Sequence, residues 1–71
     1  MERGYIKAIN PNRLFGFITP EGSKAPDMFF HARALQGGLE FTEQLKFQRV
    51  EFETGERRGR VEATAVWPAS N

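Results

Sequence analysis

The chain has 71 residues, a formal net charge of +1 and no cysteine, so we expect one small domain over residues 1–71, without disulfides or cysteine-ligated metals. This net charge is too small to indicate a nucleic-acid partner by itself, although basic residues are enriched in the first half of the chain. No apolar run approaches the roughly 20 residues of a membrane helix, and the lack of cysteine favours a reducing compartment, so we expect a cytoplasmic protein without a membrane partner.

The first two predicted strands form a hairpin. Residues 4–10 alternate between two faces, which predicts a strand with Tyr5, Lys7 and Ile9 on one face and Ile6 and Ala8 on the other. The segment Asn10-Pro11-Asn12 then predicts a turn, because proline presets its own φ and asparagine tolerates left-handed backbone. This short connection favours an antiparallel pairing with a second strand over residues 13–19.

The second strand has two possible orientations. Phe15 and Phe17 share one face, whereas Gly16 and Ile18 share the other. From this segment alone, inward packing of the rings is favoured, because exposed aromatic pairs are uncommon. If Ile18 packs inward instead, the rings form an outward apolar surface beside Arg13, which suits the stacking of single-stranded bases.

A third strand over residues 27–31 follows a loop over residues 20–26. Met28 and Phe30 have the parity to fill a core, and Phe29 and His31 then face outward. In a three-stranded meander, four planar side chains would lie side by side on one face: Phe15, Phe17, Phe29 and His31. Four such side chains on neighbouring strands indicate a surface for stacking bases more specifically than any one of them does.

The rest of the chain predicts two more strands and their connections. The segments are a short helical turn over residues 32–39, a connection over 39–45, a strand over 48–54, a polar turn over 55–59 and a last strand over 60–67. Pro68 ends the last strand. Five short strands in so small a chain predict a closed or nearly closed β-barrel, because closure removes exposed strand edges.

Three segments closely resemble the cold-shock domain family: Gly4-Tyr5-Ile6-Lys7, Arg13-Leu14-Phe15-Gly16-Phe17-Ile18-Thr19-Pro20 and Asp27-Met28-Phe29-Phe30-His31. The last two match the family's two ribonucleoprotein motifs, and the likeness covers essentially the whole chain. The resemblance implies an all-β, five-stranded antiparallel OB-fold barrel that binds single-stranded DNA and RNA on an aromatic face. It therefore favours the outward orientation of the rings.

The resemblance also implies the residues of a nucleic-acid-binding site. The stacking side chains would be Phe15, Phe17, Phe29 and His31, and further contacts would come from Lys7, Arg13, Asp27, Phe41 and Arg58. Structural roles stay open for several of these: the basic side chains also suit solvated charges, Asp27 suits fixing its loop, and Phe41 suits anchoring its connection. No cofactor, metal or catalytic residue is expected, because no acid, base, nucleophile or ligand set accompanies the single histidine.

The chain departs from the family pattern at several positions. Ala8, Ile9 and Ala32 stand where the family usually has aromatic residues, whereas Leu14 and Phe47 stand where it tends to have glycine. A stacked base contributes about 1–3 kcal/mol per ring. The loss of two or three stacking positions is therefore expected to weaken binding by several powers of ten unless something compensates.

Two functions follow as hypotheses. The leading one is a sequence-tolerant binder of single-stranded nucleic acid, a monomer or weak homodimer, acting as an RNA chaperone or as a regulator of transcription or translation. The alternative is a protein-interaction or dimerisation module that uses the depleted platform as an apolar patch. The first predicts binding of short oligonucleotides that falls with added salt, and the second predicts a dimer that hides Phe15 and Phe29.

Overall fold

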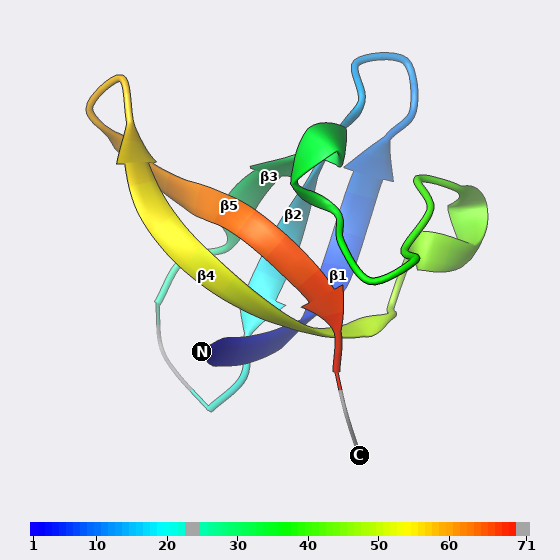
Figure 1. Ribbon diagram of the computed structural model, residues 1–71, viewed down its shortest axis with the longest axis horizontal. Coiled ribbons are helices and arrows are strands. Elements are labelled where there is room, and N and C mark those ends of the chain that lie inside the picture. Colours follow the sequence, from blue (N-terminus) through cyan, green and yellow to red (C-terminus); the bar gives the residue numbers. More distant parts are fainter. Residues whose placement is uncertain (23–24, 70–71) are drawn as a thin grey trace.

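The computed structural model describes residues 1–22 and 25–69, in which five strands form a closed barrel (Figure 1). The strands are β1 (Glu2–Asn10), β2 (Phe15–Pro20), β3 (Met28–His31), β4 (Arg49–Arg57) and β5 (Arg60–Pro68). Two short 3₁₀-helices, η1 (Ala32–Ala34) and η2 (Glu43–Leu45), lie in the connection between β3 and β4. The expected all-β, five-stranded barrel is confirmed.

The strands follow one another around the barrel in the order β1-β2-β3-β5-β4. Antiparallel pairs join β1 to β2, β1 to β4, β2 to β3 and β4 to β5. The ring closes where β3 and β5 run parallel, with Phe30 paired to Ala63. The expected antiparallel arrangement thus holds for every pair but this one, since a closed ring with an odd number of strands must contain a parallel pair.

Several boundaries differ from the sequence prediction. β2 begins at Phe15, because the predicted first residues of that strand belong to a turn in which the backbone N–H groups of Arg13 and Leu14 donate to the Asn10 carbonyl. β4 continues to Arg57, so the predicted polar turn shrinks to residues 58 and 59, both with positive φ. Residues 23 and 24 of the predicted loop lie outside the described residues.

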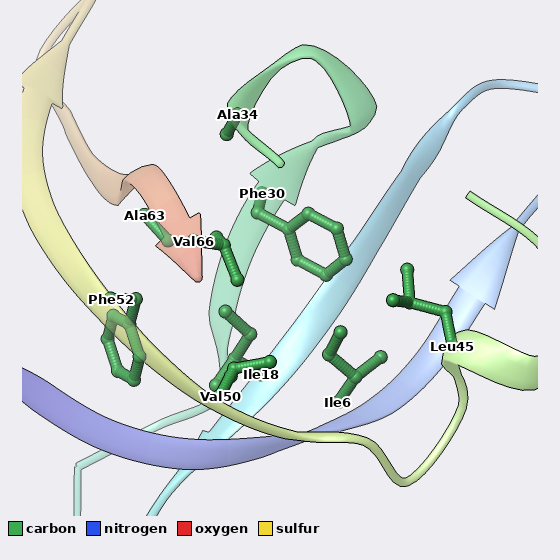
Figure 2. Packing of buried hydrophobic residues seen from close by; sticks show 9 residues of the cluster. All are labelled: Ile6, Ile18, Phe30, Ala34, Leu45, Val50, Phe52, Ala63 and Val66. Carbon is green, nitrogen blue, oxygen red and sulfur yellow. The ribbon is translucent and has the colours of Figure 1, made fainter. Parts of the chain in front are cut away.

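The core lies inside the barrel and is made of buried apolar side chains from every strand and both 3₁₀-helices (Figure 2). Its members are Ile6, Ile18, Phe30, Ala34, Leu45, Val50, Phe52, Ala63 and Val66. The ring of Phe30 projects from β3 into the middle of this cluster. A Cβ at Gly16 would lie 2.8 Å from that ring, so glycine lets β2 pass close behind it.

Candidate functional site

Four planar side chains lie together on the outer face of β2 and β3. The β2–β3 register pairs Phe15 with His31 and Phe17 with Phe29. Ring centroids are 5.4 Å apart for Phe15 and Phe29, 5.9 Å for Phe15 and Phe17, and 6.0 Å for Phe17 and Phe29. Each phenylalanine therefore packs against the other two, and the set of Phe15, Phe17, Phe29 and His31 is called the platform below.

The platform faces solvent. None of its members belongs to the buried core, and Phe17 is 36% exposed. The intervening residues Gly16, Ile18 and Phe30 are buried. The predicted outward orientation of the rings is therefore confirmed, and the interpretation of β2 as an ordinary strand with buried phenylalanines is excluded.

His31 is held by the backbone that follows it. Its Nδ1 accepts a hydrogen bond of 3.1 Å from the backbone N–H of Arg33, which caps η1. When Nδ1 acts as the acceptor, a neutral imidazole carries its proton on Nε2. The ring is thus oriented by the main chain, and Nε2 is the donor that it retains for a ligand.

β1 joins the same outer face through a β-bulge at Lys7. The register of β1 on β2 shifts between Ile6, paired with Ile18, and Ala8, paired with Phe17. One extra residue resets the alternation of the strand. Because paired residues share a face of the sheet, Ala8 lies on the outer face beside Phe17.

The predicted faces of β1 are therefore wrong beyond Lys7. Regular alternation put Ala8 on the face of Ile6 and Ile9 on the face of Lys7, but the bulge reverses both. Ile9 pairs with Gly16 and packs against the core. Ala8 is thus a true gap beside the platform, whereas Ile9 is partly buried against the core and does not lie on the platform face.

Lys7 and Asp27 form an ion pair beside the platform. Lys7 Nζ lies 3.1 Å from Asp27 Oδ2, and Asp27 Oδ1 accepts a hydrogen bond of 3.0 Å from Thr19 Oγ1. The hydrogen bonds from Lys7 and then Thr19 lower the pKa of Asp27 below its ordinary value of 3.8. The two side chains are 59% and 33% exposed, so this ion pair is open to exchange with a ligand.

The remaining three predicted contact residues lie in three different connections. Arg13 is exposed in the turn between β1 and β2, two positions before Phe15, and does not lie on the strand face as predicted. Arg58 occupies the β4–β5 turn with a φ of 53°. Phe41 packs against the core, with its ring centroid 6.4 Å from that of Phe30 at 64°. Phe41 thus anchors the connection between β3 and β4. Its contact with bases stays a prediction.

A hollow of about 550 Å³ adjoins the platform along β3. Phe29 and His31 line one part of it, and the β4–β5 hairpin lines another. Its other lining residues are Arg33, Arg57, Arg58, Arg60, Val61 and Glu62. Sequence reasoning identified only Arg58 among the four arginines. The run Arg57-Arg58-Gly59-Arg60 was the available signal, whereas the approach of Arg33 from η1 depends on tertiary structure.

Aromatic and basic groups therefore dominate the site.

Within residues 1–22 and 25–69, no group of three or more histidine, aspartate or glutamate side chains is placed to hold a metal ion. The same part of the chain contains no helix with the length and apolarity needed to cross a membrane.

Comparison with known proteins gives one family over most of the chain. The model of the 'Cold-shock' DNA-binding domain matches residues 2–69. The chain is 40% identical over 67 residues to the "Probable cold shock protein A" of Mycolicibacterium smegmatis, covering 93% of this chain and 96% of that protein. It is 44% identical over 54 residues to the "Major cold shock protein" of Micrococcus luteus, covering 76% and 78%. It is 46% identical over 52 residues to the "Cold shock-like protein CspC" of Escherichia coli, covering 72% and 71%.

Proposed function

The chain belongs to the 'cold-shock' DNA-binding domain family, and we propose that it binds single-stranded nucleic acid, RNA or DNA, with low sequence specificity on the platform. Nucleic-acid binding of the cold-shock type is supported by the family and by the cold shock proteins that the chain resembles. These comparisons do not favour the alternative of a protein-interaction or dimerisation module.

The observation that carries the proposal is the platform itself. Three phenylalanines pack on one another on the outer face of the sheet, although burial of such rings would stabilise the fold by about 1.5–3 kcal/mol each. Every base has a flat π-face, so stacking on these rings tolerates any sequence. His31 adds a fourth planar group and a hydrogen-bond donor at the end of β3.

Basic side chains around the platform supply the second component of binding. Arg13 and Arg58 are exposed and form no ion pair with any residue that the structure describes. Lys7 reaches a phosphate by leaving Asp27, whose carboxylate then becomes free to accept hydrogen bonds from bases. Each phosphate contact releases counterions, so the affinity for oligonucleotides should fall with added salt.

The proposed activity needs no cofactor and no catalysis. A protein that binds only unpaired strands stabilises them relative to base-paired structure, by a free energy that rises with the logarithm of one plus its free concentration over its dissociation constant. Such selective binding opens weak RNA secondary structure, which is the action of an RNA chaperone. The same property lets the protein alter transcription or translation by holding a nascent or messenger strand unpaired.

The test is fluorescence anisotropy with labelled oligo-dT and oligo-U at two salt concentrations. Phe15→Ala removes one platform ring, and we expect it to weaken binding about 5- to 150-fold, equivalent to about 1–3 kcal/mol. Phe47→Ala is the matched control, because Phe47 is 66% exposed and lies outside the platform. The control is expected to keep the affinity of the native chain.

Two results would contradict the proposal. The first is no binding of either oligonucleotide by the native chain at low salt. The second is an equal loss of affinity in Phe15→Ala and Phe47→Ala, because the effect would then not depend on the platform.

A further inference from the structure

We propose that the hollow beside His31 is a second, arginine-lined subsite, which holds a phosphate-bearing nucleotide of the strand that crosses the platform. This inference rests on the proposed function, because its ligand is the same strand. The subsite would replace by charge part of the stacking that Ala8 and Ala32 do not provide.

The geometry makes the hollow continuous with the platform. Phe29 and His31 belong to both, so a strand that leaves the platform past β3 enters the hollow directly. Its volume of about 550 Å³ lies within the range of about 300–1,000 Å³ that is usual for small-ligand sites. Val61, 60% exposed, gives the hollow an apolar surface on the β5 side.

The charge of the hollow suits an anion. Arg33, Arg57, Arg58 and Arg60 face one carboxylate, that of Glu62. None of these four arginines forms an ion pair with a residue in the described ranges. Two arginines elsewhere form ion pairs: Arg3 with Glu51, and Arg49 with Glu21. Uncompensated guanidinium groups are thus concentrated around this hollow.

The β4–β5 hairpin holds three of these arginines, Arg57, Arg58 and Arg60, in an arrangement that does not favour folding. Arg57 and Arg60 are direct cross-strand partners, and like charges placed opposite one another destabilise a hairpin. Arg58 between them has a φ of 53°, which side-chain-bearing residues rarely adopt. A bound phosphate would offset this repulsion. Anion binding, rather than the stability of the fold, is therefore a physical reason for this cluster of arginines.

Guanidinium chemistry identifies the kind of ligand. The guanidinium group of arginine has a planar fork of N–H donors that can bind two phosphate oxygens at once. Its flat face also stacks on an unpaired base. Arginines on both sides of the hollow can therefore hold the phosphate and the base of one nucleotide without any further aromatic ring.

The experiment compares two double variants that remove the same net charge. In Arg57→Gln/Arg60→Gln the hollow loses two cations, whereas Lys46→Gln/Arg49→Gln loses two cations near the opposite end of β4. Binding of labelled oligo-dT is titrated with salt by anisotropy, and thermal unfolding is followed by circular dichroism. The native chain and the Phe15→Ala variant are measured in the same series.

We expect the hollow variant to lose two phosphate contacts. The slope of log affinity against log salt should then become shallower by about 1.4, since each contact on a single strand contributes about 0.7. At 0.1 M salt the same relation predicts a loss of affinity of more than about tenfold. The midpoint of thermal unfolding should not fall, because the variant removes a repulsive pair. The control should keep the native slope.

Failure of this inference is distinguishable from failure of the proposed function. If the native chain binds and Phe15→Ala weakens binding, but the two double variants behave alike, the subsite is wrong and the platform stands. If the native chain does not bind at all, both are wrong. If the hollow variant is less stable than the native chain, the salt slope of Arg33→Gln is measured instead, because Arg33 lies on η1 outside the hairpin. An unchanged salt slope in Arg33→Gln overturns the subsite.

Discussion

At the scale of single residues, three side chains sit on backbone that favours glycine. Leu14, Phe47 and Arg58 have φ values of 59°, 70° and 53°. A left-handed backbone costs a residue with a Cβ about 1–2 kcal/mol. Leu14 and Phe47 are also the two positions where the family tends to have glycine. The structure thus gives the physical reason for that pattern, and this chain carries strain that a glycine would remove.

We expect Phe47→Gly to raise the free energy of unfolding by about 0.5–1 kcal/mol, as the strain relieved exceeds the added entropy of the unfolded chain. Urea denaturation measures the change. Lys46→Gly is the control, because it removes the same contact between Lys46 Nζ and the Phe47 ring, at 5.4 Å, but changes a residue with a φ of −61°. The control should lower the free energy of unfolding, and equal effects of the two substitutions would contradict the explanation.

Asp27 predicts a dependence of stability on pH. Its pKa is lower in the folded protein than its ordinary value of 3.8, because Lys7 and Thr19 donate hydrogen bonds to its carboxylate. The resulting stabilisation is therefore complete above the ordinary pKa and is lost as the pH falls through the folded one. We expect Asp27→Asn to lower the free energy of unfolding at pH 7 by less than about 1 kcal/mol, since the pair is exposed.

Urea denaturation of the native chain and of Asp27→Asn at pH 7 and near the acid limit measures this effect. The difference between them should shrink as the pH falls. Glu40→Gln is a control that removes the same charge from an exposed carboxylate with no ion pair to a described residue. A difference between Asp27→Asn and the native chain that stays constant with pH would show that the carboxylate does not act through its charge.

At the scale of elements, two irregular pairings decide which side chains reach the surface. The bulge at Lys7 turns Ala8 outward and Ile9 inward. A second shift, between Glu53 and Thr54 in the pairing of β4 with β5, lets Ala63 and Val66 both reach the core although they are an odd number of positions apart in the strand. In both strands the extra residue reverses the alternation on which inward and outward positions depend.

The bulge predicts opposite outcomes for neighbouring substitutions in β1. Ala8→Trp places a ring beside Phe17, and we expect it to tighten oligonucleotide binding by about 5- to 150-fold without loss of stability. Ile9→Trp overfills the core and should cost about 1–3 kcal/mol of unfolding free energy. Anisotropy and urea denaturation measure the two effects. A folded Ala8→Trp variant without a gain in affinity would show that this position does not reach the bases.

At the scale of the whole molecule, adjacent residues of β3 point to opposite sides of the barrel wall, one into the core and the next onto the proposed binding face. Phe30 has no exposed surface, whereas its neighbours Phe29 and His31 are half-exposed. A small domain is stabilised by only about 5–15 kcal/mol, so each core residue carries a large share. The core residue and the residues of the proposed binding face therefore occupy adjacent positions of the same short strand.

This separation predicts two different losses. Phe30→Ala should cost about 3–5 kcal/mol of unfolding free energy and leave much of the chain unfolded at 37 °C. Phe29→Ala removes contacts with two neighbouring rings, and we expect a stability loss of about 0.5–1.5 kcal/mol with a much larger loss in oligonucleotide affinity. Thermal unfolding and anisotropy distinguish the two. A Phe29→Ala variant as unstable as Phe30→Ala would place Phe29 in the core.

Much of the fold and the centre of the site could be predicted from local pattern. The parities of residues 15–18 and 28–31 indicate which side chains share a face, and the family resemblance then indicates which face is outside. Arg13 was misplaced because its strand begins later, after a turn closed by Asn10. The oligomeric state and the cytoplasmic location stay predictions.

The amino-acid sequence by itself determined the five-stranded barrel and the faces of β2 and β3 that carry the aromatic platform, because alternation and turn residues act over a few neighbouring positions. Tertiary structure decided the bulge at Lys7, the ion pair between Lys7 and Asp27, and the gathering of Arg33 with the hairpin arginines. These features join residues far apart in the chain, and their contacts depend on the register in which the closed barrel brings the strands together.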